Sequence, residues 1–338
     1  MKLVRGMRKG GTLTVLSWNF ERNGADDPAK RLRAHQLLVS LTPHLVFRQE
    51  MWGADANGKQ IMYELEDVLG LRGWLGPRAS TAVFADPGMF QPLREWPDVG
   101  PMWVQAPTAL TLRFAPAGTG SMPMAVASYH LNYASAANRL SEAEWLTVWA
   151  DKSWTTPDGE TVRMPALLAG DNNSYPVPVA DEDVPLPGLR AIADRPHRLH
   201  RSFVGPSGRR VMDTRPDEVM RTAGLEDVAR HWSLARDGNE AALARTVDAC
   251  ETHGPDSRID RIYASSDLLP AVVGVDVVEV PKTDSDHHIV RLKLDAEHLV
   301  DILNRQPVKV AVPGEEEHAD HLFGCPETVG NSHCSQHS

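Results

Sequence analysis

The chain has 338 residues and a formal net charge of −10 at pH 7, with 42% hydrophobic and 24% charged residues. This content suffices for one large domain or two small ones, and it gives no overall basic field that would attract nucleic acid, although a local basic rim or bound cations could do so. Three cysteines do not make a disulfide framework, so we expect a reducing, cytoplasmic location. No run approaches the roughly 20 apolar residues of a membrane span, and we expect no signal peptide in the basic N-terminus.

The first predicted elements alternate between strands and helices. Residues 13–18 form a β-rich run, and Asp27-Pro28 supplies an N-cap and an N1 proline for a helix to about Leu41. Residues 45–50 read as a second strand that carries a carboxylate at its end. Residues 61–69 then have helical apolar spacing. This alternation predicts a layered α/β domain.

The middle of the chain is richer in strand patterns. Residues 80–84 and 90–93 flank the turn signal Asp86-Pro87-Gly88, which predicts a hairpin, and residues 108–114 and 124–130 predict a second pair. A capping-box pattern from Ser141 to Glu144 predicts the start of a helix.

The later strands each carry or deliver polar residues. A short buried-type strand at 165–169 precedes Gly-Asp-Asn-Asn at 170–173. Residues 257–263 alternate, so that Asp260 shares a face with Ile262. Residues 217–223 are predicted to be helical, and strands at 272–280 and 289–294 end the regular pattern.

Residues 175–215 are the least regular part and are rich in proline, then in arginine and histidine. Two interpretations stay open: a solvated surface insertion, or a local basic rim that meets substrate phosphates. In the second, the substrate-binding residues are Arg198, Arg201, Arg209 and Arg210. The tail beyond about Val312 contains histidines and cysteines whose spacing matches no compact zinc module, and we expect a flexible terminus.

Polar residues follow or lie within most of the predicted strands. Carboxylate and amide oxygens suit Mg²⁺ or Mn²⁺ better than zinc, and an acidic neighbour can set the charge or tautomer of a histidine. Singly, each such residue could be an ordinary turn or surface residue. Together they fit phosphoester hydrolysis by an activated water. The candidates are Asn19, Glu21, Glu50, His130, Asp171, Asn173, Asp260, Asp286 and His287.

Six short motifs occur in a fixed order: SWNFE, RQE, YHLN, GDNN, SRIDRIY and SDHH. This ordered set resembles the endonuclease/exonuclease/phosphatase superfamily, which includes deoxyribonucleases, abasic-site endonucleases, inositol polyphosphate phosphatases and neutral sphingomyelinases. The resemblance runs from about Thr12 to Leu294. It implies a four-layer α/β sandwich, with two mostly antiparallel sheets face to face, helices outside and the site at one rim. We therefore divide the chain into an N-terminal extension (1–11), a catalytic domain (12–295) and a tail (296–338).

On the metal side, the resemblance implies four ligands or supporting groups. Glu50 would be the principal ligand of a Mg²⁺ or Mn²⁺ ion, and Asn19 would support the metal and the phosphate. Glu21 stands where some members place a further acidic ligand. Asp286 would be a carboxylate on the metal side.

On the catalytic side, the resemblance implies a water activator and donors to the phosphate. Asp171 would position or deprotonate the attacking water, and Asn173 would bind a phosphate oxygen. His287 would contact the scissile phosphate and be polarised by Asp260. His130 would be the second imidazole of the deoxyribonuclease-like members.

The sequence thus predicts a Mg²⁺-dependent phosphoester hydrolase. The preferred interpretation is a nuclease acting on DNA or RNA, supported by the two histidines and the basic stretch at 175–215. The alternative is a phosphatase or phosphodiesterase acting on a nucleotide, inositol, lipid or other small-molecule phosphate. A non-catalytic binding scaffold is the third interpretation, and the complete set of polar residues argues against it.

Overall fold

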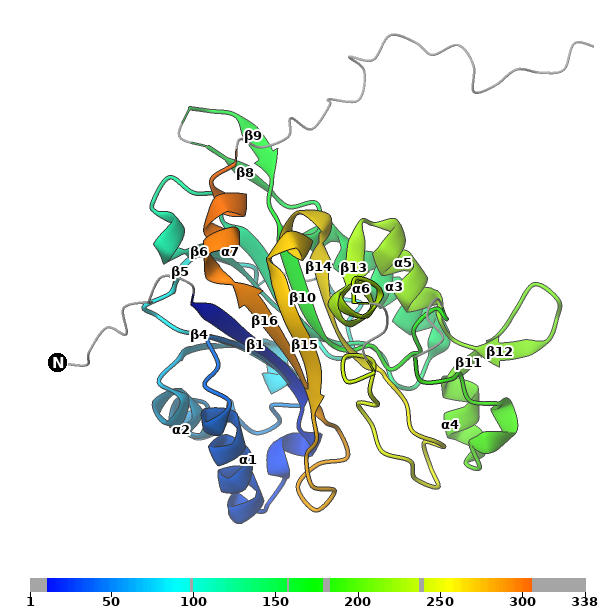
Figure 1. Cartoon of the computed structure of the whole chain (residues 1–338). Helices are drawn as coiled ribbons and strands as arrows, with labels where there is room; N and C mark the ends of the chain where they lie inside the picture. The colour runs from blue at the N-terminus through cyan, green and yellow to red at the C-terminus, as the bar shows by residue number, and fades with distance from the viewer. Residues whose placement is uncertain (1–10, 98–99, 157, 179–182, 237–239, 306–338) are drawn as a thin grey trace, which may run out of the picture.

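The computed structural model describes residues 11–97, 100–156, 158–178, 183–236 and 240–305. Two six-stranded sheets lie face to face with helices around them (Figure 1), which confirms the predicted α/β sandwich. Within the described residues, no helix is both long and apolar enough to cross a membrane. Residues 1–10 of the predicted extension (1–11) and residues 306–338 of the predicted tail (296–338) lie outside the described residues.

The first sheet is built around the N-terminal strand. Its parallel pair is β1 with β2, and its other neighbours are antiparallel. Its strand order is β15 (Val272–Val278), β16 (Ile289–Asp295), β1 (Thr12–Asn19), β2 (Leu45–Gln49), β4 (Thr81–Ala85) and β3 (Arg72–Leu75).

The second sheet repeats this pattern of pairing. Its parallel pair is β10 with β7, and its other neighbours are antiparallel. Its strand order is β13 (Leu225–Asp227), β14 (Asp260–Ser265), β10 (Ala166–Asp171), β7 (Met124–His130), β6 (Thr108–Phe114) and β5 (Phe90–Glu95).

Helices cover the outer faces of both sheets. Helices α1 (Pro28–Ser40) and α2 (Gln60–Leu69) pack on the first sheet, and α3 (Ala136–Leu146) and α5 (Arg215–Thr222) pack on the second. The core between the sheets also takes side chains from two shorter helices at its edge, α6 (Val228–Leu234) and α7 (Ala296–Leu303). Apolar side chains therefore occupy both faces of the central strands, since both faces are covered.

The predicted capping of α1 is present. Asp27 is its N-cap, with the carboxylate accepting the backbone N–H of Lys30 at 2.9 Å, and Pro28 stands at the first helical position. Helix α2 ends at Gly70, whose φ of 68° lies in the left-handed region that glycine enters at little cost. These local signals set where the layer over the first sheet begins and ends.

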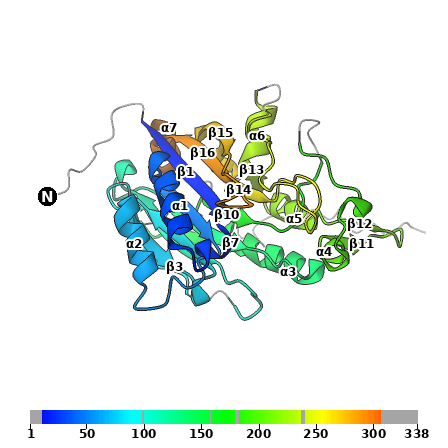
Figure 2. The ribbon, with the colours of Figure 1, turned by 90° about the horizontal axis from the view of Figure 1, so that it is seen from below.

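Part of the 175–215 insertion is regular. It contains α4 (Arg195–His200) and the hairpin β11 (Ser202–Val204) with β12 (Arg210–Met212). Figure 2 shows this part grouped with α3 and α5, apart from α1 and α2. A second small hairpin joins β8 (Ser153–Thr155) to β9 (Thr161–Arg163).

The predicted hairpin between residues 80–84 and 90–93 is wrong. The turn at Asp86 forms, with the backbone N–H groups of Met89 and Phe90 donating to its carbonyl oxygen. However, β4 pairs with β2 and β3, whereas β5 pairs with β6 in the other sheet. Both edges of β4 are already occupied, so the turn carries the chain from one sheet to the other.

One predicted helix start and one predicted domain boundary also differ from the structure. Helix α3 begins at Ala136, because Ser135 accepts the N–H of Asn138, and the capping-box pattern at Ser141 lies inside the helix. Residues 296–303, which we assigned to the tail, form α7. Leu299, Ile302 and Leu303 bury one face of that helix in the core. The predicted boundary at residue 295 therefore omits a helix that packs on the domain.

Candidate active site

The candidate residues meet where the parallel pairs of both sheets end. Strands β1 and β2 run in one direction and finish at Asn19 and Gln49, while β7 and β10 finish at His130 and Asp171. The inward-facing row of each strand is apolar along the core and becomes polar at this end. The antiparallel neighbours β14 and β16 begin at the same rim, which brings Asp260 and His287 there.

Asp171 is the central side chain of this site. It pairs with His130 on β7 and with Asp260 on β14 in the register of the second sheet. Its Oδ2 accepts the side-chain amide of Asn19 at 3.1 Å and lies 3.5 Å from Nε2 of His130. The same oxygen is 4.0 Å from Nε2 of His287. Groups from both sheets therefore converge on one carboxylate oxygen.

The surroundings of Asp171 keep it ionised. Burial disfavours the charged carboxylate, but the imidazoles of His130 and His287 outweigh burial and lower the pKa of Asp171 below 3.8. The guanidinium of Arg201 adds to this effect, as does the backbone N–H of Asn173, which donates to Oδ1 at 2.6 Å. A buried, ionised carboxylate with one oxygen facing two imidazoles can accept a proton from a water.

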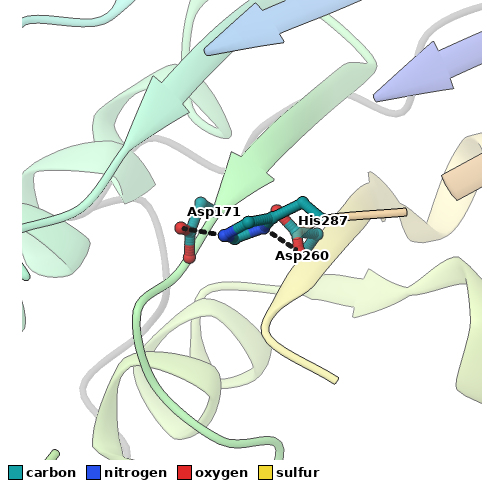
Figure 3. Close-up of side chains that lie close together, drawn as sticks. All are labelled: Asp171, Asp260 and His287. Atoms are coloured by element: carbon teal, nitrogen blue, oxygen red, sulfur yellow. Dashed lines mark hydrogen bonds and ion pairs between the residues drawn. The ribbon is translucent and has the colours of Figure 1, made fainter. Parts of the chain in front are cut away.

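His287 lies between two carboxylates (Figure 3). Its Nδ1 is 2.8 Å from Oδ2 of Asp260, and its Nε2 faces Asp171. Burial alone would lower the pKa of His287, but Asp260 and then Asp171 raise it to about 10. The pKa of Asp260 is itself raised by burial. Because the pair shares a single short hydrogen bond, we describe it as an imidazolium held by the Asp260 carboxylate.

Glu50 and Asn19 form the side of the site that belongs to the first sheet. Glu50 follows β2 with a φ of 56°, and its Oε2 accepts the backbone N–H of Arg22 at 2.7 Å. The amide of Asn19 lies 3.4 Å from Oε1 of Glu50. The side-chain oxygen of Asn19, Oδ1, is buried and has no hydrogen-bond partner among the described residues. An uncompensated buried acceptor beside a carboxylate is what a cation site requires.

The structure places three other predicted site residues in surroundings that differ from one another. The Glu21 side chain is 53% exposed and lies 3.8 Å from Lys30. Asp286 is half-buried, and its Oδ1 is buried without a partner among the described residues. Asn173 donates its side-chain amide to the carbonyl of Leu131 at 2.9 Å and has a φ of 49°. The roles of Glu21, Asp286 and Asn173 stay predictions.

The four predicted substrate-binding arginines separate into distinct environments. Arg198 donates to the carbonyls of Ile192 and Ala193, and Arg210 donates to the carbonyl of Ser202. Arg209 is exposed, whereas Arg201 is buried. Their role in substrate binding stays a prediction.

Several residues that support the site were not predicted. The hydroxyl of Thr246 accepts the backbone N–H groups of Ile259 and Asp260, each at 3.0 Å, and so fixes the start of β14. The amide of Gln49 donates to the hydroxyl of Ser128 at 3.0 Å, which links the two sheets near the rim. Gln49 lies within the RQE motif and would have been the easier to find. Thr246 has no local sequence signal.

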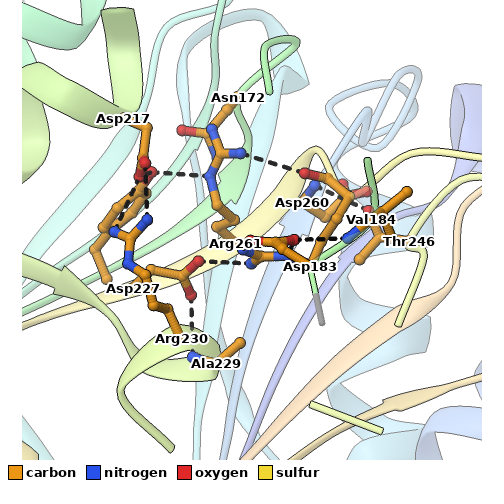
Figure 4. A network of polar contacts seen from close by, with 12 residues as sticks. Asn172, Asp183, Val184, Asp217, Asp227, Ala229, Arg230, Thr246, Asp260 and Arg261 are labelled. Carbon is orange, nitrogen blue, oxygen red and sulfur yellow. Dashed lines mark hydrogen bonds and ion pairs between the residues drawn. The ribbon is translucent and has the colours of Figure 1, made fainter. Parts of the chain in front are cut away.

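A buried network of charges holds the outer side of β14 (Figure 4). Arg230 donates to Asp217 at 3.0 Å, and Asp217 also accepts the hydroxyl of Tyr263 at 2.6 Å. Arg258 pairs with Asp183 at 2.7 Å and with Asp227. The alternation predicted for residues 257–263 is thus present, with Asp260 facing the site and Arg261 and Tyr263 facing this network.

Comparison with known families agrees with this geometry. The model of the Endonuclease/Exonuclease/phosphatase family matches residues 16–287, a range that contains every member of the cluster around Asp171. The chain belongs to this family. It is a phosphoester hydrolase, as the sequence motifs predicted. A search of curated protein sequences found no match.

Solved structures of other phosphoester-processing proteins share the family fold. An AP endonuclease from Archaeoglobus fulgidus aligns with a TM-score of 0.55 and 15% identity, over 84% of this chain and 100% of that one. A humanized TDP2 from D. rerio gives a TM-score of 0.53 and 13% identity, covering 84% and 99%. The 3′ phosphatase NExo from Neisseria gives 0.52 and 14%, also covering 84% and 99%. At these identities the likeness shows the fold alone.

Enzymes of this family use divalent metal ions, and the donors here suit one. Glu50 offers carboxylate oxygens, and Oδ1 of Asn19 and Oδ1 of Asp286 have no hydrogen-bond partner among the described residues; all of these are hard oxygen donors. Asp171, Asp260 and His287 also offer ligand atoms within 4.8 Å of one another. His287 already bonds Asp260 through Nδ1, however, which leaves fewer free ligand atoms in that group.

Proposed function

We propose that the chain is a Mg²⁺-dependent phosphodiesterase that cleaves DNA or RNA by attack of a water on the phosphate. The observation that carries this proposal is the convergence of Asn19, His130 and His287 on Oδ2 of Asp171, with Glu50 adjacent. This arrangement supplies a proton acceptor, imidazole donors and a cation site within one cluster of side chains, and phosphoester hydrolysis needs all three.

Asp171 orients the attacking water and accepts its proton. Its lowered pKa keeps the carboxylate ionised, and its hydrogen bonds from Asn19 and Asn173 hold it in one orientation. A pre-oriented acceptor lowers the entropic cost of bringing the water into line with the phosphorus atom.

His287 donates its Nε2–H to a phosphate oxygen on which negative charge develops. Asp260 holds Nδ1 and stabilises the imidazolium, so that the donor is aimed and charged before the substrate arrives. His130 presents a second Nε2 to the same region, 3.5 Å from Asp171. Asn173 binds a further phosphate oxygen.

The metal side is held by Glu50, with Asn19 and Asp286 as further oxygen ligands. When bound there, Mg²⁺ or Mn²⁺ neutralises charge on the phosphate oxygens. Hydrogen bonds from the Arg22 N–H and the Asn19 amide fix the Glu50 carboxylate in place, which pre-organises a ligand at low entropic cost.

A nucleic-acid substrate is supported by what the structural relatives bind. One TDP2 structure from D. rerio holds a single-stranded DNA product, and NExo from Neisseria is bound to a product DNA hairpin. The cytoplasmic location is retained from the cysteine count as part of the same proposal.

The test is a substrate panel with purified protein and Mg²⁺: plasmid, single-stranded DNA, RNA, nucleotide phosphates and inositol phosphates. We expect cleavage of a nucleic acid. Asp171→Asn and His287→Ala should each lower turnover by about 10²-fold or more, because each removes a group that acts in the transition state. His298→Ala is the matched control, since His298 lies on α7 with a 60% exposed side chain.

The panel separates the alternatives. Turnover of only the nucleotide or inositol phosphates, with the same dependence on Asp171, would replace the nuclease by a small-molecule phosphatase. Mg²⁺ binding without turnover of any substrate would favour a non-catalytic scaffold.

A further inference from the structure

The insertion at 175–215 is tied by its backbone to the loop that follows Asp171. The N–H of Tyr175 donates to the carbonyl of Asp213 at 3.0 Å, and the N–H of Asp213 donates to the carbonyl of Arg201 at 3.1 Å. Arg139 on α3 reinforces this link by donating to the carbonyl of His200 and to the Asp213 carboxylate, each at 2.7 Å. Arg201 therefore has a fixed position beside the catalytic loop.

The guanidinium of Arg201 is buried and incompletely paired. The residue is 5% exposed, and its Nε donates to Nε2 of His197 at 3.1 Å. Its Nη1 is buried and has no hydrogen-bond partner among the described residues. A buried, unpaired N–H of a charged group loses its hydration without gaining a partner, so such a donor is unfavourable without a ligand.

Within the part of the chain that the structure describes, Arg201 forms no salt bridge with a carboxylate, although its charge helps to lower the pKa of Asp171. The nearest acidic residue along the backbone link, Asp213, gives its two oxygens to Arg139 and Arg215, at 2.7 and 2.8 Å. His197 is a neutral acceptor, because burial lowers its pKa to about 3. The positive charge of Arg201 thus stays available to an anion.

A second imidazole, that of His253, packs against the histidine that accepts from Arg201. His253 stacks on His197 with ring centroids 4.4 Å apart and planes 17° apart. It comes from the loop in which Gly254 packs against Ile192, where an added Cβ would lie 2.8 Å from Cγ1 of Ile192. Burial lowers the pKa of His253, and the charges of Asp286 and His287 also act on it, which locates the stack beside the catalytic cluster.

We infer that Arg201, oriented by His197, binds a phosphate group of the substrate next to the scissile one. The ligand is assigned on the basis of the proposed function, since it is part of the same substrate. Among the described residues no hydrogen bond or salt bridge joins Arg201 to Asp171, His287 or Glu50. Its charge nevertheless acts on Asp171, so it lies beside the reaction centre and meets an adjoining anion. A fork-shaped cation with a free N–H is the group best suited to a phosphate oxygen.

The other three arginines of this segment differ in a way that supports the assignment. Arg198 and Arg210 donate hydrogen bonds to backbone carbonyls of the insertion, which gives them a structural role. Arg209 is exposed beside the turn at Gly208 between β11 and β12. Among these four, and considering the described residues, Arg201 alone combines burial with a donor that has no partner.

The experiment measures binding of inorganic pyrophosphate and of inorganic phosphate by calorimetry in metal-free buffer. Pyrophosphate carries two adjacent phosphate groups, and phosphate carries one. We expect wild type to prefer pyrophosphate, and Arg201→Gln to lose about tenfold or more of its pyrophosphate affinity, as expected for one charged hydrogen bond. Arg72→Gln is the matched control and should bind as wild type does, since Arg72 lies on β3 with a 62% exposed side chain.

Two further variants guard against a failure of folding. Arg201→Lys keeps the buried charge without the fork and should recover part of the affinity. His197→Gln leaves Arg201 in place but loosens its orientation, and should give a smaller loss than Arg201→Gln. Circular dichroism verifies the fold of each variant. Pyrophosphate binding that is the same in wild type and in folded Arg201→Gln or Arg201→Lys would overturn the inference.

This result is independent of the nuclease assay. Nucleic-acid cleavage by a protein whose pyrophosphate affinity does not depend on Arg201 would remove the inference and leave the proposed function. Arg201-dependent binding in a protein that cleaves no nucleic acid would keep the anion site and assign it to another phosphate substrate.

Discussion

The side-chain amide of Asn19 donates to Oδ2 of Asp171 at 3.1 Å, across 152 residues of sequence. Asn19 ends β1 in one sheet and Asp171 ends β10 in the other. Each residue is the last one on its strand whose side chain faces the other sheet. The hydrogen bond therefore joins the two sheets at the rim of the core. The catalytic cluster is therefore built across the gap between the two sheets, and its geometry depends on how the sheets pack.

Asp260 should matter through the charge it keeps on His287. We expect Asp260→Asn to lower kcat by about 10²-fold or more, because the aimed imidazolium loses its counter-ion. Since Asp260 raises the pKa of His287 to about 10, its removal should also move the alkaline limb of the pH–rate profile to lower pH. Asp267→Asn, on the exposed surface, is the control. An unshifted alkaline limb would show that His287 does not act as the charged donor.

The proposed metal ligands can be ranked by how much each contributes to the affinity of the protein for Mg²⁺ or Mn²⁺. Glu50→Gln should weaken Mg²⁺ or Mn²⁺ binding by about tenfold or more, because a charged hard ligand is lost. Asp286→Asn should weaken it less. Glu21→Gln should leave the affinity unchanged, since the Glu21 side chain is 53% exposed and pairs with Lys30. Calorimetric titration with each metal measures this, and an equal loss for Glu21→Gln would return Glu21 to the ligand set.

The buried charge network on the outer side of β14 should contribute strongly to the free energy of unfolding. Asp217 accepts from Arg230, from the hydroxyl of Tyr263 and from the backbone N–H of Val177. Asp217→Asn removes the charge that compensates buried Arg230, and should cost about 3–5 kcal/mol in the free energy of unfolding. Urea denaturation measures this cost, with the exposed neighbour Glu218→Gln as the control. A loss within about 0.5 kcal/mol, typical of surface changes, would contradict it.

His35 should make stability fall in acid. Burial, with the charges of Arg48 and Arg31, lowers the pKa of His35 to about 4. Between pH 6.5 and 4 the unfolded chain binds a proton at this residue and the folded chain does not. Stability from His35 is thus fully present above pH 6.5 and is lost as the pH falls, by up to about 3 kcal/mol.

The measurement for His35 is the free energy of unfolding in urea at several pH values from 7 to 4. His35→Gln should flatten its decline with falling pH, whereas His298→Gln on the surface of α7 should not. Parallel curves for wild type and His35→Gln would show that other groups cause the acid sensitivity.

Much of the fold follows from local pattern. The Asp27-Pro28 cap, the alternation through Asp260 and Ile262, and the pairing of residues 108–114 with 124–130 all appear in the structure. Such signals depend on neighbours within a few residues, so they can be read directly from the sequence. The hairpin at Asp86 was mispredicted because a turn signal does not say which sheet the next strand joins.

By itself, the sequence determined most strands of the two sheets, the family and the types of side chain at the ends of the strands. Only the tertiary structure decided that Asp171 is the meeting point, that Glu21 faces outward, and that Arg201 alone of four arginines is buried with a free donor. The physical reason is that periodicity and capping are local, whereas burial and hydrogen-bond partners arise from contacts between segments far apart in the chain. The chemistry could be read from residue types, but the neighbours of each residue could not.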